Sequence, residues 1–368
     1  MSTKTSIFSY KPGQSIDYVK TKYKLADVIK LASNENPYGP SKDVTKAVKN
    51  LIQEIHRYPD SHSNKLKNSL VKKLSLKNIN ENNILIGNGS NEILEFVARA
   101  FLDHKSEVIF SKHSFLVYKI ISNLSKAKII ETKPISNKYN QFLGTDLNKI
   151  LEKINNKTKV IFIANPNNPT GTILDISELS NFLKYIPKKI IVVIDEAYYE
   201  YSAYLNKSSA VNLIKQFPNL VVTRTFSKIY GLAGLRVGYG IGSKNIINIL
   251  TAYRQPFNIN IVAQSLADIA LSDQEHVKYC LKKNLDGMNY IISCFEKLGI
   301  DYLSPYGNFI TLNLGKNTKT LYNKLIRKGI ILRPLDNYGL NSYLRLTIGT
   351  SSENDIFINT FTKILKKK

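Results

Sequence analysis

The chain has 368 residues, of which 43% are hydrophobic, so it can bury a large core as two domains or as one large domain with a satellite. Its 52 lysine and arginine residues outnumber 28 aspartate and glutamate residues, which gives a formal net charge of +24. This balance fits a nucleic-acid or membrane partner or anionic substrates, but dispersed lysines more often form a solvated basic face, so we expect neither nucleic acid nor membrane as a partner.

Residues 1–38 form an N-terminal arm punctuated by proline and glycine. The arm lacks the apolar core of a secretory signal, and no apolar run in the chain approaches the ~20 residues of a membrane span. We therefore expect a cytoplasmic protein. The histidines form no HxxxH or HExxH pair and the two cysteines form no CxxC pair, so neither a metal site nor a disulfide framework is expected.

From about residue 84 to residue 240, short runs rich in Val and Ile alternate with helix-like segments. The runs are too short for helices and predict strands: NILIGNG, SEVIFS, AKIIET, KVIFIANP, KKIIVVIDEA, NLVVTRT and LRVGYGIG. Residues 174–186 predict a helix capped by Asp175 and Glu178, and residues 208–217 predict another. This alternation predicts an α/β fold with a doubly wound, mostly parallel sheet covered on both faces.

The last third of the chain has a different pattern. Helical character dominates after Pro256, and three short strand candidates follow: NFITLNL, GIILRPL and YLRLTIG. We expect a smaller α+β domain over residues 262–368, which the arm 1–38 joins, beside a large domain over residues 39–261. No tether separates the two, so the boundary should lie in a helix or a short turn.

Ligands of open α/β sheets bind outside the carboxyl ends of the strands, so the residues after the apolar runs are candidates for a site. Lys228, desolvated in a turn of hydroxyl and glycine residues, would have a lowered pKa and could form a Schiff base, although solvated surface lysines are commoner. Asp195 ends a strongly apolar strand, where a carboxylate is costly unless a cation pairs with it. A protonated pyridine nitrogen is such a cation, so the two residues fit pyridoxal phosphate.

The turn GNGSNE, residues 87–92, opens a helix whose free N–H groups suit a phosphate. It also matches the first part of a dinucleotide-binding fingerprint. However, Glu92 replaces the third glycine, and the next strand ends in Ser111 and Lys112 rather than in an acid that could bind ribose. A P-loop sequence, GxxxxGK followed by Ser or Thr, is absent from the chain. Dehydrogenase and P-loop functions are therefore disfavoured.

These residues belong to motifs that cover nearly the whole chain. NPNNPTG, IDEAY and RTFSKIYGLAGLRVGYG resemble the pyridoxal-phosphate aminotransferases of the aspartate aminotransferase fold. LASNENPYGP, RYPD and NYGL are similar to a narrower family, the histidinol-phosphate aminotransferases. The resemblance implies pyridoxal 5'-phosphate as cofactor and a homodimer with shared active sites.

The resemblance also implies roles for single residues around the cofactor. Lys228 would bind its aldehyde and move the proton, and Asp195 would pair with the pyridine nitrogen. Asn168 and Tyr198 would hold its phenolic oxygen. Its phosphate would be bound around the helix start and the lysine turn, by Ser90, Asn91, Thr225, Ser227 and Arg236.

Further roles concern the cofactor ring, the second subunit and the substrate. Phe115 would stack on the ring unless it is an ordinary core aromatic, and Tyr58 would reach the phosphate from the neighbouring subunit. Arg345 would clamp a substrate anion bidentately. Additional candidates for substrate binding are Arg333, Tyr10 and Asn34.

Two positions depart from the family pattern. His113 and Ser114 precede Phe115 where much of the family has Pro-Thr, which leaves the shape of the stacking loop open. Asn91 stands where an aspartate is frequent, which costs little if only its backbone N–H binds the phosphate.

The resemblance implies reversible amino transfer between L-glutamate and imidazole-acetol phosphate, which gives L-histidinol phosphate and 2-oxoglutarate in histidine biosynthesis. Alternatives are a relative that acts on another phosphorylated ketone or amino alcohol or on an aromatic amino acid, and a decarboxylase on the same scaffold. A basic nucleic-acid-binding regulator that retains the fold is disfavoured. No helix-turn-helix or RNP-like segment is appended, and every residue that the cofactor chemistry requires is present.

Overall fold

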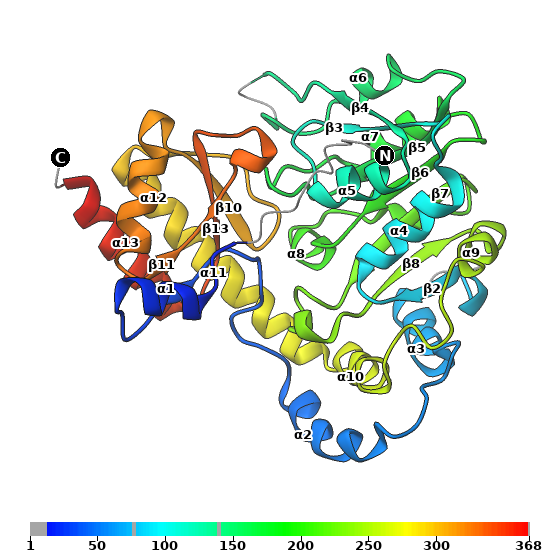
Figure 1. Ribbon diagram of the computed structural model, residues 1–368, viewed down its shortest axis with the longest axis horizontal. Helices are drawn as coiled ribbons and strands as arrows, with labels where there is room; N and C mark the ends of the chain where they lie inside the picture. Colours follow the sequence, from blue (N-terminus) through cyan, green and yellow to red (C-terminus); the bar gives the residue numbers. More distant parts are fainter. Residues whose placement is uncertain (1–12, 76–78, 138–140, 367–368) are drawn as a thin grey trace, which may run out of the picture.

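The computed structural model describes residues 13–75, 79–137 and 141–366 (Figure 1). A large sheet with helices on its faces forms one unit, and a smaller sheet with helices forms a second unit beside it. None of the described helices combines the length and the apolar character that a membrane span requires.

The large sheet has seven strands in the order β2-β8-β7-β6-β5-β3-β4. The strands are β2 (Ile84–Gly87), β3 (Glu107–Ser111), β4 (Lys128–Thr132), β5 (Thr158–Ala164), β6 (Ile191–Asp195), β7 (Leu220–Thr225) and β8 (Gly238–Gly242). Strands β3 to β7 run parallel, whereas β8 is antiparallel to both of its neighbours. Each predicted strand run contains one of these strands, which confirms the mostly parallel, doubly wound α/β sheet.

Both faces of this sheet are buried, because successive strand residues enter two different apolar clusters. On β6, Val192 and Ile194 belong to one cluster, and Val193 belongs to the other. The first cluster includes residues of α2 (Lys42–Leu51), α3 (Asn64–Leu74), α6 (Leu147–Leu151), α7 (Ile176–Lys184), α8 (Tyr199–Tyr204) and α10 (Ile261–Ser272). The second includes residues of α4 (Ser90–Phe101), α5 (Leu116–Leu124) and α9 (Lys244–Thr251).

One of the two predicted helices in this region forms as expected. Helix α7 begins after Asp175, whose backbone N–H is bound by Glu178 in a capping box. The helix predicted over 208–217 is wrong, because only a short 3₁₀ turn, η3 (Ala210–Leu213), is present there. The backbone N–H of Ala210 is bound by the carboxylate of Glu196, a tertiary contact that the local pattern does not reveal.

The small unit has a four-stranded antiparallel sheet in the order β12-β13-β10-β9. Its strands are β9 (Asp301–Tyr302), β10 (Phe309–Asn313), β12 (Arg333–Pro334) and β13 (Tyr343–Thr347). The arm contributes α1 (Ile16–Tyr23) and β1 (Ile29–Lys30), and β1 pairs in parallel with β11 (Ile330–Ile331). The arm is therefore bound to the C-terminal part of the chain.

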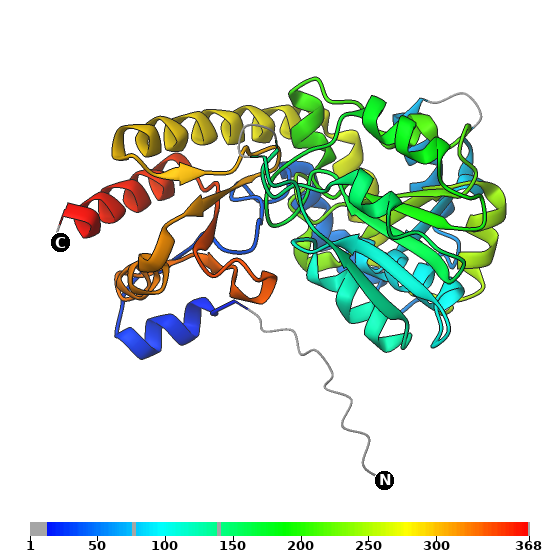
Figure 2. The same cartoon turned by 90° about the horizontal axis from the view of Figure 1, so that it is seen from above.

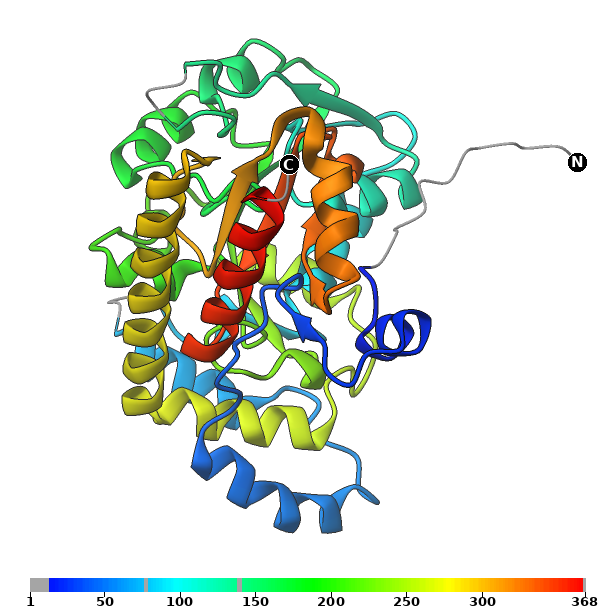
Figure 3. The same ribbon diagram turned by 90° about the vertical axis from the view of Figure 1, so that its left-hand side faces the viewer.

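Three helices pack on the small sheet: α11 (Gln274–Leu298), α12 (Thr318–Ile326) and α13 (Ser351–Lys366). Figure 2 shows α11 reaching from the small unit towards the large one. Figure 3 shows the three helices side by side. The remaining 3₁₀ turns are η1 (Ile52–Glu54), η2 (Glu81–Asn83), η4 (Ala233–Leu235), η5 (Gly315–Asn317) and η6 (Asp336–Tyr338). The domain boundaries at residues 39 and 262 remain predictions.

Candidate active site

A cavity lies at the carboxyl ends of β5, β6 and β7, where the topology of an open α/β sheet places ligands. Its lining residues are Ser90, Asn91, Phe115, Ala164, Pro166, Asn168, Asp195, Ala197, Tyr198, Thr225, Ser227, Lys228 and Arg236. Apart from Ala164, Pro166 and Ala197, every one of them is a candidate from the sequence. The fold therefore brings together residues that lie up to 146 positions apart, from Ser90 to Arg236.

Lys228 projects into this cavity from the turn that follows β7. Its Nζ lies 3.4 Å from the carbonyl oxygen of Ser33 and 5.5 Å from the ring centroid of Tyr198. Burial, together with the nearby Arg345 guanidinium, lowers the pKa of Lys228 from 10.5 to about 8. An amine with such a pKa can lose its proton close to neutral pH, as a nucleophile or a general base requires.

Asp195 ends β6 and is only 4% exposed. Its carboxylate accepts hydrogen bonds from the hydroxyls of Thr223, at 3.0 Å, and Tyr118, at 3.1 Å. Burial raises the pKa of Asp195 from 3.8 to about 6 in spite of these bonds. No lysine, arginine or histidine of the described residues forms an ion pair with it. The site therefore offers a buried carboxylate to a cationic group of a ligand.

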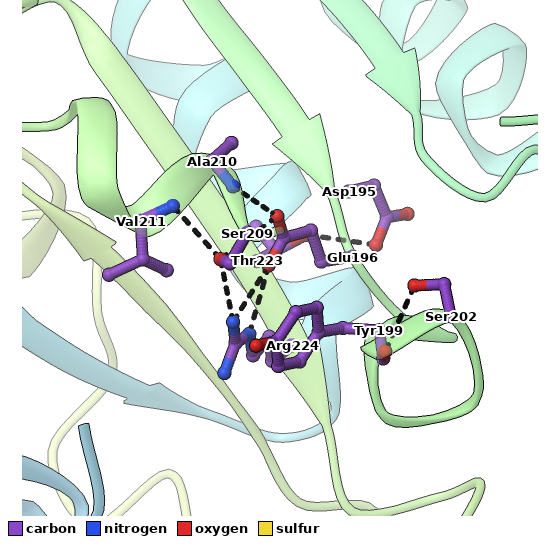
Figure 4. Close-up of polar contacts among 9 residues, drawn as sticks. All are labelled: Asp195, Glu196, Tyr199, Ser202, Ser209, Ala210, Val211, Thr223 and Arg224. Atoms are coloured by element: carbon purple, nitrogen blue, oxygen red, sulfur yellow. Dashed lines mark hydrogen bonds and ion pairs between the residues drawn. The ribbon is translucent and has the colours of Figure 1, made fainter. Parts of the chain in front are cut away.

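Glu196 follows Asp195 on the chain, and its side chain points the opposite way (Figure 4). One oxygen of Glu196 accepts from Nε and Nη2 of Arg224 at 3.0 and 2.9 Å, and both side chains are almost completely buried. The hydroxyl of Ser209 also donates to Glu196, and the Arg224 guanidinium lies 3.7 Å from the ring centroid of Tyr199. This network ties the carboxyl end of β6 to that of β7, and so fixes the strand ends that carry Asp195 and the lysine turn.

The other end of the cavity suits an anion. Helix α4 begins at Ser90, so its first backbone N–H groups face the cavity with the positive end of the helix dipole. Arg236 has a left-handed backbone (φ 54°), and its Nη1 donates to Ser227 Oγ at 3.2 Å. Gly89 has φ +79°, a conformation that side-chain-bearing residues rarely adopt, and a Cβ there would also force the Arg236 guanidinium away from the helix start. Cation, hydroxyl and helix N-terminus together form an anion cradle.

Arg345 lies beside the cavity on β13 and is 5% exposed. Its Nη1 donates to Oδ1 of Asn168, and its Nη2 donates to the carbonyl of Ala32 at 2.8 Å. The Nε atom is buried without a hydrogen-bond partner among the described residues. Arg333 is buried directly opposite Arg345 on the neighbouring strand β12. Two guanidinium groups are therefore carried at paired positions of the small sheet.

Asn34 is 1% exposed, and its side chain binds protein groups. Its Nδ2 donates to Tyr198 Oη at 2.8 Å, and its Oδ1 accepts from Thr347 Oγ1 at 3.0 Å. Burial raises the pKa of Tyr198, while the cation of Arg345 and the bond from Asn34 oppose that rise. A role of Asn34 in substrate binding stays a prediction.

Tyr58 does not line the cavity formed by the described residues of its own chain. Tyr58 is 82% exposed and stacks on Phe257 with ring centroids 4.7 Å apart. Tyr58 is exposed and absent from the lining of this cavity, so its role in a neighbouring subunit stays a prediction. Tyr10 lies outside the described residues.

The loop before Phe115 is fixed by contacts of its two unusual residues. His113 Nδ1 lies 2.7 Å from the carbonyl oxygen of Tyr338, in the NYGL motif, and Asn167 donates to the carbonyl of His113. Burial lowers the pKa of His113, which favours the neutral ring. Ser114 is buried and its hydroxyl has no partner among the described residues. With this loop, Phe115 lines the cavity.

Two residues that the sequence did not single out, Tyr118 and Thr223, contact the candidate site residues. Tyr118 bonds Asp195, stacks on Phe162 at 4.9 Å and meets Phe115 edge to face at 5.8 Å. Its position three residues after Phe115, on one helix face, was the available signal. Thr223 lies beside Asp195 in the register of β6 and β7, which the sequence does not state.

Comparison with known proteins agrees with this geometry. The model of the family described as aminotransferase class I and II matches residues 26–361. The chain is 41% identical over 355 residues to histidinol-phosphate aminotransferase 1 of Idiomarina loihiensis, covering 96% of this chain and 94% of the relative. It is also 41% identical over 360 residues to histidinol-phosphate aminotransferase of Caldicellulosiruptor saccharolyticus, covering 98% of each. The chain belongs to the histidinol-phosphate aminotransferase family of class I and II aminotransferases.

Solved structures of similar fold include two histidinol-phosphate aminotransferases. The enzyme of Sinorhizobium meliloti, in complex with pyridoxal-5'-phosphate, has a TM-score of 0.87 at 21% identity, and the match covers 96% of this chain and 95% of that one. The enzyme of Clostridium acetobutylicum has a TM-score of 0.84 at 27% identity, with 93% and 100% covered. The resemblance inferred from the sequence motifs is thus confirmed for this aminotransferase, in family and in fold.

Proposed function

We propose that this aminotransferase uses pyridoxal 5'-phosphate to transfer an amino group between L-glutamate and imidazole-acetol phosphate, which gives L-histidinol phosphate and 2-oxoglutarate in histidine biosynthesis. The observation that carries the proposal is the placement in one cavity of Lys228, an anion cradle and Asp195, a buried carboxylate with no ion-pair partner among the described residues. The donor set fits the cofactor at both of its charged ends. Names of the curated relatives support the choice of substrate.

When bound, pyridoxal phosphate withdraws electrons from the carbon that carries the amino group. Asp195 would accept a hydrogen bond from the protonated pyridine nitrogen, whose positive charge would pair with this buried carboxylate. Lys228, whose pKa is lowered to about 8, would hold the cofactor at its aldehyde end, and its Nζ could take up and return a proton near neutral pH. Tyr198 and Asn168 hold the phenolic oxygen.

The remaining lining residues position the cofactor. Its phosphate is held in the anion cradle, by Ser90, Asn91, Thr225, Ser227 and Arg236. Phe115 would pack against the cofactor ring, and Tyr118 keeps both Phe115 and Asp195 in place through its ring contact and its hydrogen bond.

Arg345 and Arg333 are proposed to bind the anionic ends of the substrates. Arg345 Nε is a buried donor without an acceptor among the described residues, and such donors are rare unless a ligand completes them. The paired position of Arg333 on β12 suits a second anion, because glutamate and histidinol phosphate carry different anionic groups. Tyr10 remains a candidate for the phosphate end.

We also propose a homodimer in the cytoplasm. The exposed stack of Tyr58 on Phe257 is an aromatic surface feature that a second subunit can cover, which lets Tyr58 reach the partner's cavity. The two cysteines, Cys280 and Cys294, are free thiols, as is usual in a reducing compartment.

The test is a screen of amino donors and acceptors on purified protein, followed through the colour change of the cofactor. Histidinol phosphate should react with a kcat/KM at least about tenfold above that of histidinol, because one charge-assisted bond to phosphate contributes ~1.5–3 kcal/mol. Preference for another phosphorylated amine would support recognition of the phosphate but would show that histidinol phosphate is not the substrate. Equal rates without phosphate, preference for aromatic amino acids, or release of CO₂ would overturn the proposal.

A further inference from the structure

The arm between residues 31 and 34 forms a wall beside the cavity, and the cations of the site bind it. Arg345 Nη2 donates to an arm carbonyl at 2.8 Å, and Lys228 Nζ lies 3.4 Å from the carbonyl oxygen of Ser33. Asn34 has a left-handed backbone with φ 54°, a conformation that asparagine tolerates better than most residues. Both the position and the residue type of Asn34 are therefore restricted.

Asn34 is the centre of a hydrogen-bond chain that joins three parts of the molecule. Its backbone N–H donates to Thr347 Oγ1 at 2.9 Å, and the Thr347 hydroxyl donates to Asn34 Oδ1 at 3.0 Å. Its carbonyl accepts from Asn308 Nδ2 at 3.1 Å. Its Nδ2 donates to Tyr198 Oη at 2.8 Å. The arm, the small sheet and the end of β6 thus meet at one side chain.

In this chain of hydrogen bonds, the donor and the acceptor of each bond are fixed by their neighbours. Thr347 Oγ1 already accepts the backbone N–H of Asn34, so its own proton is available to the amide oxygen, and the amide nitrogen must face Tyr198. With the amide turned over, its nitrogen would face Thr347, and the buried Thr347 hydroxyl would lose its acceptor. The orientation of the amide is therefore determined by its surroundings.

The Tyr198 oxygen consequently accepts a hydrogen bond from Asn34, so its own hydroxyl proton must point elsewhere. Among the described residues, no acceptor for the Tyr198 hydroxyl is found, and Tyr198 lines the cavity. We propose that Asn34, oriented by Thr347, is a positioning residue that directs the hydroxyl proton of Tyr198 into the cavity. The inference rests on the proposed function, in which the phenolic oxygen of the cofactor is the acceptor.

Charged groups around Tyr198 agree with this arrangement. Lys228 lies above the ring and Arg345 reaches the neighbouring arm carbonyl, so two cations lie near the phenol, and Asp195 is the anion that acts on it. A cationic environment favours a site that holds a negatively charged oxygen of a ligand. Without the bond from Asn34, the hydroxyl could rotate, and its proton would no longer point in one direction.

The test is a double-mutant cycle in the dissociation constant of pyridoxal phosphate for the cofactor-free protein. Asn34→Asp keeps the size and tolerates the left-handed backbone, but a carboxylate can only accept, so Tyr198 would donate to it and away from the cavity. The dissociation constant should rise about tenfold, the effect of one hydrogen bond. Tyr198→Phe should have a similar effect, and the double mutant should bind no more weakly than Tyr198→Phe alone.

Two further variants separate positioning from a loss of fold. Thr347→Val removes the hydroxyl that orients the amide of Asn34, so it should weaken the binding of pyridoxal phosphate less than Asn34→Asp does. In the Tyr198→Phe background, Thr347→Val should have no effect on binding. Asn219→Asp is the matched control. Asn219 is also buried and donates to the carbonyl of Ile190 at 2.7 Å, but at the amino ends of β6 and β7. Its effect should be small and should add to that of Tyr198→Phe.

Additive effects of Asn34→Asp and Tyr198→Phe, or wild-type affinity in Asn34→Asp, would overturn the inference. If Asn34→Asp does not fold, the cycle of Thr347→Val with Tyr198→Phe decides in the same way. The pH dependence of the absorption of the bound cofactor should shift in Asn34→Asp and not in Asn219→Asp. Wild-type protein that binds the cofactor but transfers no amino group would contradict the proposed function alone, because the cycle measures binding.

Discussion

Replacing Asp195 by asparagine is expected to change the stability of the cofactor-free protein in opposite directions at low and at neutral pH. The carboxyl is 4% exposed and has no cationic partner among the described residues, so its ionised form is poorly solvated in the empty cavity. Asparagine has the same shape and no charge. The substitution therefore removes a single charge that destabilises the cofactor-free protein but is needed for function.

The magnitude follows from the pKa of Asp195, which burial raises from 3.8 to about 6. Between these values the folded chain binds more protons than the unfolded chain, so the stability falls as the pH rises from about 4 to about 6. At ~1.4 kcal/mol per pH unit, the loss reaches about 3 kcal/mol above pH 6. Asparagine avoids this loss, but its Nδ2 would face a hydroxyl donor of Tyr118 or Thr223, which costs about 1–2 kcal/mol.

Asp195→Asn should thus be about 1–2 kcal/mol more stable than the wild type at pH 7 and less stable by a similar amount at pH 4. Urea unfolding of cofactor-free protein at one fixed protein concentration, from pH 4 to about pH 8, measures both. Asp268 provides the matched control. It is 7% exposed but pairs with Lys65 at 3.0 Å, so Asp268→Asn should lower the stability at neutral pH.

A loss of stability in Asp195→Asn at pH 7, like that expected for Asp268→Asn, would show that the buried charge of Asp195 is not destabilising. A difference between Asp195→Asn and the wild type that did not depend on pH below about 6 would also contradict this expectation. With cofactor bound, the wild type should be more stable than Asp195→Asn at pH 7, because only the carboxylate can form an ion pair with the pyridine nitrogen. The substitution should also slow the reaction by roughly 10²–10⁴, the range of acid–base and electrostatic contributions.

Borohydride treatment of the loaded protein should attach the cofactor to Lys228, as peptide mass spectrometry can show, and Lys228→Ala should lose turnover; an adduct on another lysine would contradict this assignment. Chains with Tyr58→Ala and chains with Lys228→Ala should regain part of the activity when mixed, since each hybrid dimer has one intact site. Hybrids that form without activity would argue against a shared site. Arg345→Lys should raise the KM for both substrates, because lysine cannot reproduce the fork that bonds Asn168 and an arm carbonyl. An unchanged KM for both would exclude this role.

The large sheet could be predicted from the sequence because its strands are buried on both faces. Each strand therefore appears as a short apolar run, and β6 with Val192 and Val193 in two different clusters is the clearest case. The helix expected over 208–217 failed for a physical reason. Only the turn η3 forms there, and its start is held by Glu196, which follows β6 and accepts hydrogen bonds from the backbone N–H of Ala210 and the hydroxyl of Ser209. This contact comes from outside the segment, so the pattern of residues 208–217 does not reveal it.

Much of the candidate site could also be predicted, because the carboxyl ends of parallel strands meet at one edge of the sheet. This rule suffices to bring Asn168, Asp195 and Lys228 together. It does not reach contacts between segments far apart in the chain. Asn34 and Thr347 are 313 residues apart, and nothing in either local sequence indicates that one orients the other. The arm is therefore the part of the site that the sequence described least.

Lys228 and Asp195 are both driven towards their uncharged forms, and burial is the main cause in each. The cavity thus holds an amine with a pKa of about 8 and a carboxyl with a pKa of about 6, so both groups can exchange protons near neutral pH. A ligand with a cation at the Asp195 end and an anion at the start of α4 supplies the charges that these groups lack. Burial destabilises the charged forms of Lys228 and Asp195, and for the same reason it favours binding of a ligand that carries a cation at one end and an anion at the other.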